Sequence, residues 1–281
     1  MKKWATLLVL LTVFGILAAA CGNSSEQTTS EGAAGGESKQ INIGATTGPY
    51  SDMITKAIKP ILEKKGYTVE VTEFNDYVQP NQALANGSID ANLFQHRLYL
   101  EQFTKDNNLE LSPLITVPTA PLGIYSSKYK SIDEIADGST VALANDPTNL
   151  GRALLLLQDN KLLEVNKDMQ SSTASEKDVS ANPKNLVLQP LEAAQLPRTL
   201  QSVDVDVIPG NFALSAGIDL NSALQLENMD EQYRNLIAVR TADVDSTLAK
   251  DLKEAVQSAE FEQIIDSDFQ GFSKPEWMQT R

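Results

Sequence analysis

Short apolar segments that suit β-strands alternate with helical segments through most of the chain after residue 40. Strands are expected at 41–45, 68–74, 90–94, 140–144, 186–189, 203–208 and 235–239. Strands that alternate with helices predict parallel α/β layers. These units total about 240 residues, which fits two lobes better than one sheet.

Local patterns predict where several elements begin and end. Ser51 is expected to cap the first helix, and Pro60 should kink it because proline lacks a backbone N–H. Ser131 and Glu134 have the spacing of a capping box. Pro113 is expected to bound an extended segment that runs from residue 114 to 125.

The first 20 residues are typical of an export signal. Lys2 and Lys3 precede an uncharged run over 4–20 that is short for a membrane-spanning helix, and three alanines precede Cys21, the only cysteine. This start resembles a bacterial lipoprotein signal, which implies a lipid on Cys21, although Ala18 stands where that pattern favours leucine. An ordinary secretory signal or an uncleaved anchor are the alternatives. Residues 21–40 are expected to form a flexible tether, because 22–40 hold no large apolar side chain.

Charge and composition exclude several functions. The formal charge is −14, and removal of Lys2 and Lys3 makes it −16, which argues against a nucleic-acid-binding protein. One cysteine and one histidine cannot build a disulfide framework or a typical zinc site, so no metal and no cofactor are predicted.

Candidate ligand-binding residues follow from the rule that pockets in open α/β sheets lie beyond the carboxyl ends of strands. Aromatic, amide and hydroxyl side chains concentrate in the turns at 46–50, 75–77, 95–96, 145–149 and 209–212, with Arg152 one turn further on. Arg152 would hold a carboxylate, and Asn149 and Asn211 could bond to either end of a small zwitterion. The walls would come from the aromatic side chains of Tyr50, Tyr77, Phe94, His96 and Tyr99.

Each of these residues also has a structural interpretation. His96 could be a satisfied structural histidine, and Arg152 could pair with one of the many acids on the surface. Phe94 and Tyr99 could belong to the core, and Asn149 could cap a helix.

Several blocks in order resemble the NlpA/MetQ family, whose members are lipid-anchored methionine-binding proteins of ABC importers. The resemblance covers residues 41–277. It rests on Asp90-Ala-Asn-Leu-Phe-Gln-His96 with Tyr99-Leu100, Asn145-Asp-Pro-Thr-Asn-Leu-Gly-Arg152 with the leucines after it, Asn75-Asp-Tyr77 with Pro80-Asn81, Gly44-Ala-Thr46 with Gly48-Pro49, and Asn211 with Ala213.

The resemblance implies a two-lobed type II periplasmic-binding-protein fold with the ligand in the cleft between the lobes. The first lobe would span 41–127 and 235–281, and the second 128–234. Arg152 and Asn211 would hold the backbone of an amino acid, and Tyr77, Phe94, His96 and Tyr99, with Asn149, would line its side-chain pocket. Tyr50 and Leu98 stand where the family often has His and Pro, and relatives accept D-methionine, oxidised methionine or a short dipeptide.

The resemblance also implies partners and a location. We expect a monomer on the outer face of the cell membrane that meets the membrane subunits of an ABC transporter. An enzyme is not expected, because the chain has no Gly-x-Ser-x-Gly, no His-Glu-x-x-His and no cysteine after Cys21. The alternatives are a receptor for another amino acid, a methionine derivative or a short dipeptide, and a surface interaction lipoprotein without a transport role.

Overall fold

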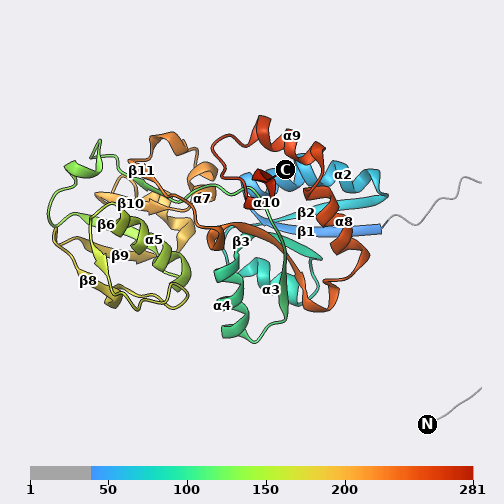
Figure 1. Ribbon diagram of the computed structural model, residues 1–281, viewed down its shortest axis with the longest axis horizontal. Helices are drawn as coiled ribbons and strands as arrows, with labels where there is room; N and C mark the ends of the chain where they lie inside the picture. Colours follow the sequence, from blue (N-terminus) through green and yellow to red (C-terminus); the bar gives the residue numbers. More distant parts are fainter. Residues whose placement is uncertain (1–38, 281) are drawn as a thin grey trace, which may run out of the picture. The chain divides into compact units, whose positions relative to one another are not determined.

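A computed structural model describes residues 39–280 of the chain. The predicted signal peptide, Cys21 and all but the last two residues of the predicted tether lie outside these described residues. Within them, two five-stranded sheets form two lobes, and the first lobe contains both the blue N-terminal and the red C-terminal segments in Figure 1. The folded body begins at Lys39, two residues before the expected start.

The sheet of the first lobe has the order β2-β1-β3-β12-β4. Its strands are β1 (Lys39–Thr46), β2 (Tyr67–Phe74), β3 (Ala91–His96), β4 (Leu111–Thr116) and β12 (Asn235–Arg240). β1 runs parallel to β2 and β3, as predicted, but β12 runs antiparallel to β3 and β4. The all-parallel expectation is therefore wrong for β12, because the chain re-enters this sheet beside the carboxyl end of β3 and must run the other way.

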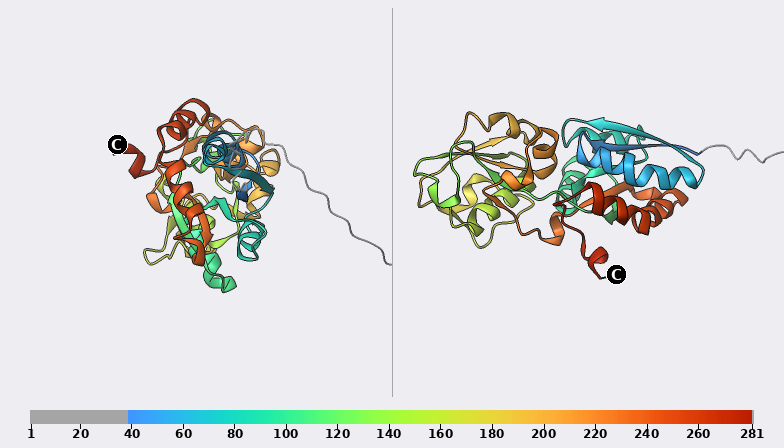
Figure 2. Two further views of the ribbon diagram at one scale, coloured as in Figure 1. Left: turned by 90° about the vertical axis from the view of Figure 1, so that its right-hand side faces the viewer. Right: turned by 90° about the horizontal axis from the view of Figure 1, so that it is seen from above.

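Helices cover both faces of this sheet. One face carries α1 (Pro49–Met53), the π-helical turn η1 (Ile54–Ile58), α2 (Lys59–Lys64), α8 (Thr247–Val256) and α9 (Ala259–Asp268), which lie together in Figure 2. The other face carries α3 (Gln79–Ala85) and α4 (Arg97–Asn107), whose Leu84 and Leu100 pack against Leu236. The short α10 (Glu276–Gln279) ends the described chain.

The first helix begins earlier than predicted and is interrupted by a π-helical turn just before Pro60. Ser51 is not the cap, because the helix already begins at Pro49 and the Ser51 hydroxyl donates to the Gly48 carbonyl. Gly48 has a φ of 103° and lies so close to Ser215 of the second lobe that a Cβ there would clash. Pro60 follows a π-turn closed by the Lys59 N–H and the Ile54 carbonyl, and this wider turn accommodates the missing donor.

The sheet of the second lobe has the order β11-β5-β10-β6-β9. Its strands are β5 (Gly123–Tyr125), β6 (Thr140–Ala144), β9 (Val187–Leu191), β10 (Val205–Ile208) and β11 (Gln225–Leu226), and its helices are α5 (Pro147–Asp159), α6 (Leu196–Thr199) and α7 (Gly210–Ser215). A separate hairpin pairs β7 (Glu164–Val165) with β8 (Val179–Ala181). Short 3-10 turns are η2 (Ile132–Glu134), η3 (Glu176–Asp178), η4 (Ala193–Gln195), η5 (Leu220–Ser222), η6 (Glu231–Tyr233) and η7 (Thr241–Asp243).

Two further boundary predictions are wrong. Ser131 makes no capping hydrogen bond, and Glu134 instead accepts from the Lys130 N–H at 2.7 Å, so only a 3-10 turn forms. Pro113 lies inside β4, where the pairing with β12 shifts register between Ile237 and Ala238. A register irregularity is a position where a strand tolerates proline.

Two crossover segments connect the lobes. Because β4 belongs to the first sheet and β5 to the second, the first crossover is 117–122, which is earlier than the predicted boundary at residue 127. The second crossover, 227–234, lies between β11 and β12. Thr119 on the first crossover pairs with Ser273, and its hydroxyl accepts from the Asn235 N–H at 2.8 Å.

A buried acid in the second lobe predicts a pH-dependent stability. Asp206 on β10 is fully buried, and the Thr199 hydroxyl lies 3.0 and 3.1 Å from its two carboxylate oxygens. Burial raises the pKa of Asp206 to about 7. Since this lies above the unfolded value of about 3.9, the group's stabilising contribution is complete at low pH and is lost as pH rises through 7.

Asp206→Asn should therefore become more stable than the wild type as pH rises. We expect the difference in the free energy of unfolding to grow by about 2–4 kcal/mol between pH 4 and pH 8. Denaturant unfolding at both pH values measures it, with the exposed Asp133→Asn as a matched control. A difference that does not change with pH would contradict the role of Asp206.

Candidate functional site

One pocket between the lobes collects all eight residues that the sequence singled out for ligand binding. Tyr50, Tyr77, Phe94, His96 and Tyr99 come from the first lobe, and Asn149, Arg152 and Asn211 from the second. The free cavity between these side chains is only about 10 Å³, roughly the space of one water molecule, so the two lobes hold the pocket nearly closed.

The end of β3 and the start of α4 form the aromatic wall. Phe94 and His96 both line the pocket from β3, whose pairing with β12 shifts register beside Phe94, and Tyr99 follows in the first turn of α4. The ring centroids of Tyr77, Phe94 and Tyr99 lie 5.8–6.0 Å apart. Gln95 and His96 were expected in a turn after the strand, but β3 continues through them because they still pair with β12.

His96 connects the two lobes as a neutral side chain. Its Nδ1 accepts from the Tyr99 N–H at 3.2 Å, so its proton lies on Nε2, which is 3.3 Å from Asn149 Oδ1. Asn149 is not the helix cap, because Asp146 takes that position and its carboxylate accepts from the Asn149 side-chain amide. Burial, and then the charge of Arg152, lower the pKa of His96 to about 3. The imidazole is therefore uncharged at neutral pH.

Arg152 is buried and already paired with an acid that the sequence did not single out. Its Nε donates to Glu227 Oε2 at 2.8 Å, its Nη2 donates to Glu227 Oε1, and both side chains are less than a tenth exposed. Burial alone would lower the pKa of Arg152, but the charge and hydrogen bonds of Glu227 raise it. The surface interpretation of Arg152 is therefore wrong.

Asn211 presents an unused donor. Its Oδ1 accepts from the Tyr77 hydroxyl of the opposite lobe at 2.8 Å. Its Nδ2 is buried and has no hydrogen-bond partner among residues 39–280. Leaving a buried donor without a partner costs about 1–3 kcal/mol. An acceptor atom in the pocket would remove that cost.

Other lining residues come from the first crossover, from the start of β12 and from positions beside the predicted ones. They are Gln95, Thr119, Ala120, Pro209, Gly210 and Asn235. The Tyr50 hydroxyl accepts from the Ala120 N–H at 3.3 Å, and burial raises its pKa. Gln95 exchanges two hydrogen bonds with Asn81, so a rigid amide pair supports the pocket. Leu98, which departs from the family pattern, is not among the lining residues, whereas Tyr50 is.

The described part of the chain contains no group of three side chains suited to hold a metal ion. Within the same residues, no helix has the length and apolar character needed to cross a membrane.

Comparisons with known proteins agree with the expected family and fold. The model of the NlpA lipoprotein family matches residues 41–277. The D-methionine-binding lipoprotein MetQ of Salmonella typhi is 38% identical over 98% of this chain and 99% of its own. A nutrient-binding protein from Burkholderia cenocepacia, solved bound to methionine, is 40% identical with a TM-score of 0.79 over 82% of this chain and 97% of its own. An ABC transporter periplasmic substrate-binding protein from Coxiella burnetii is 32% identical with a TM-score of 0.78 over 83% and 99%. The predicted two-lobed fold is thereby confirmed.

Proposed function

Because the chain belongs to the NlpA lipoprotein family, we propose that it is an extracytoplasmic substrate-binding protein that captures methionine or a close relative and delivers it to an ABC importer. The proposed ligand-binding residues are Tyr77, Phe94, His96, Tyr99, Asn149, Arg152 and Asn211, with Tyr50 beside them. The protein acts as a monomer, and its partners are the ligand, the membrane subunits of the importer and the membrane itself.

The observation that carries this proposal is the pairing of unused polar donors with an aromatic wall in one pocket. The free Nδ2 of Asn211 and the guanidinium of Arg152 offer donors for a carboxylate, and Tyr77, Phe94 and Tyr99 offer apolar surface. An α-amino acid with an apolar side chain has both complementary parts. One relative compared above is named for binding D-methionine, and another was solved bound to methionine.

Capture works by closure of the two lobes around the ligand. The lobes already meet through the Tyr77–Asn211 and His96–Asn149 contacts, so these pairs close the pocket to water. Each hydrogen bond to the charged end of the ligand would contribute about 1.5–3 kcal/mol, and each buried methylene about 0.8 kcal/mol. An apolar pocket discriminates only about 10–200-fold between ligands whose side chains differ by one methylene.

Mass spectrometry of the small molecule that copurifies with the native protein tests the ligand without presupposing methionine. A thermal-shift panel of amino acids, methionine derivatives and dipeptides then ranks candidates. At 100 times the dissociation constant a ligand adds about 2.7 kcal/mol, which raises the melting temperature of a domain of this size by about 5–10 °C. If another amino acid or a dipeptide copurifies or gives the largest shift, that compound replaces methionine as the proposed ligand. No shift in melting temperature with any candidate would favour a surface interaction lipoprotein.

A catalytic role of His96 as a general base does not fit the geometry of the site. Nδ1 of His96 already accepts from a backbone N–H, and the low pKa of the ring makes it a weak base. The relatives compared above are described as binding proteins. Absence of any product after incubation with the identified ligand would agree with a binding role.

The membrane anchor is the lipid on Cys21 in this proposal. Cys21→Ala should abolish lipid attachment and release soluble mature protein from membranes. Fractionation of cells that express the variant measures this, with the wild type as reference. A variant that still sediments with membranes would show an uncleaved N-terminal anchor instead.

A further inference from the structure

We propose that Glu227 is a positioning residue that balances the charge of Arg152 and thereby makes the pocket select ligands without net charge. This inference rests on the proposed function and describes how the same site discriminates between charged forms of its ligand. Sequence reasoning did not single out Glu227, which lies on the second crossover segment and outside the pocket lining.

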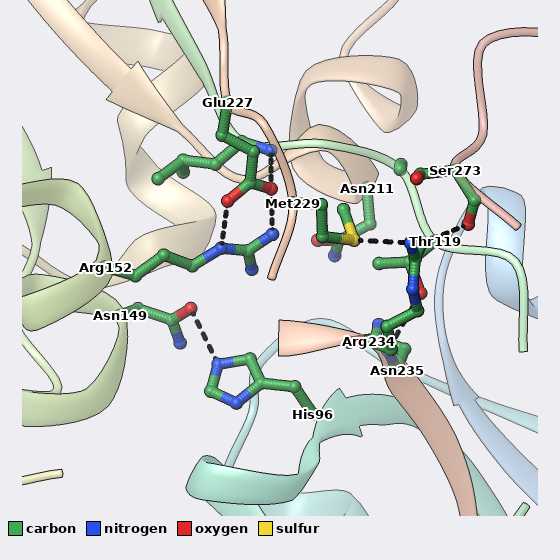
Figure 3. A network of polar contacts seen from close by, with 12 residues as sticks. His96, Thr119, Asn149, Arg152, Asn211, Glu227, Met229, Arg234, Asn235 and Ser273 are labelled. Atoms are coloured by element: carbon green, nitrogen blue, oxygen red, sulfur yellow. Dashed lines mark hydrogen bonds and ion pairs between the residues drawn. The ribbon is translucent and has the colours of Figure 1, made fainter. Parts of the chain in front are cut away.

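Glu227 and Arg152 form a buried ion pair. Glu227 engages Nε and Nη2 of Arg152 side by side, and the third guanidinium nitrogen, Nη1, has no hydrogen-bond partner within residues 39–280. Figure 3 shows the guanidinium between Glu227 and the side of the pocket where His96 and Asn149 lie. The acid therefore fixes the plane of the guanidinium and leaves one nitrogen for the ligand.

The backbone of the first crossover holds Glu227 in turn. Its Oε1 also accepts from the Leu122 N–H at 2.7 Å, and its own N–H donates to the Leu122 carbonyl at 2.9 Å. Leu122 and Glu227 lie on the two different crossovers. The carboxylate is thus anchored where the crossovers are bonded to each other, and it orients Arg152 independently of any ligand.

Arg152 and Glu227 carry opposite charges at the pocket. Among the lining residues Arg152 is the only ionised side chain at neutral pH, because His96 is neutral. Glu227 balances the charge of Arg152, and a further carboxylate, that of Asp146, is bonded to the side-chain amide of Asn149 behind the lining. A zwitterion keeps that balance, whereas a ligand with a net charge leaves one charge uncompensated in a buried site, which is costly.

Methionine and methioninamide test this directly, because they share shape and differ in net charge. At pH 6 the amide is a cation and methionine is a zwitterion, since an α-amino group titrates near pH 8. In Glu227→Gln the pocket gains one positive charge, so methionine should gain or keep affinity while the amide loses it. We expect the ratio of the dissociation constants, amide over acid, to rise at least tenfold, measured by calorimetric competition.

Two variants separate charge from structure. Glu231→Gln removes an acid from the same crossover that pairs with Arg234 instead, and its ratio should stay at the wild-type value. Glu227→Asp keeps the charge with a shorter side chain, so overall affinity should fall while the ratio stays within about threefold of the wild type.

The outcomes are distinct. A ratio in Glu227→Gln equal to that of the wild type would overturn the charge-balancing role, because a purely structural role weakens both ligands alike. If Glu227→Gln does not fold, Glu227→Asp decides, and a tenfold change in its ratio would overturn the inference. A wild-type protein that binds neither compound would overturn the proposed function, and this inference with it.

Discussion

Arg152→Ala should lose most of its ligand affinity and a substantial part of its stability at the same time. The ligand carboxylate loses its cation in a closed pocket, and truncation of one partner of a buried charge pair costs about 2–5 kcal/mol in binding. The same change leaves Glu227 buried without its partner, which costs about 3–5 kcal/mol in folding. Calorimetry with the identified ligand and denaturant unfolding without ligand measure the two losses separately.

A double variant distinguishes the two effects. Arg152→Met combined with Glu227→Leu removes both charges, and replacement of a buried ion pair by apolar side chains is often neutral or stabilising. We therefore expect stability near that of the wild type and affinity as low as in Arg152→Ala. Recovery of affinity in the double variant would show that Arg152 acts through Glu227 alone and does not contact the ligand.

Sequence reasoning identified the pocket residues because chain topology places them. The carboxyl ends of β3 and β6 and the helices that follow them meet between the lobes, so Phe94, His96 and Tyr99 had to lie near Asn149 and Arg152 once the α/β order was clear. The sequence blocks that resemble the NlpA/MetQ family further reduced the number of candidate residues. Tyr77 followed from the same rule, since it lies just after β2.

The sequence could not identify Glu227 as the partner of Arg152, and the cause is physical. Arg152 in the apolar segment after Gly151 does require a buried acid, but 37 acidic residues were available and no local pattern marks the partner. The segment around Glu227 contains only the two-residue strand β11 and short turns, which carry no periodicity. Contacts between distant crossovers depend on the tertiary fold and leave no signal in a single sequence.

The predicted cap at Ser131 and the effect of Pro60 also depend on the tertiary structure. Ser131 has the residue type and spacing of a cap, yet its turn is too short to leave several free N–H groups, and Glu134 bonds to Lys130 instead. At Pro60 the sequence predicted a disturbance, but not that a π-turn would absorb it. Local propensity indicates where a helix is perturbed, and packing decides how.

Asn211→Asp should weaken binding of a carboxylate ligand by about 3 kcal/mol, or roughly 150-fold. The isosteric change keeps an oxygen that accepts from the Tyr77 hydroxyl, so the contact between the lobes survives. It replaces the unpartnered Nδ2 donor with an anionic oxygen, which loses one charge-assisted hydrogen bond and adds repulsion of a like charge. Calorimetry with methionine or the copurified ligand measures the loss.

Asn86→Asp is the matched control for Asn211→Asp. Asn86 is exposed, and its Oδ1 only accepts hydrogen bonds, from the N–H and hydroxyl of Ser88, so aspartate can replace it without loss. Both variants add the same charge to a chain of net charge −14, and a general effect of charge would appear equally in each. Affinity should therefore fall only in Asn211→Asp. Equal affinity in the two variants would mean that the free donor of Asn211 does not face the ligand carboxylate, and Arg152 would then be its main anchor.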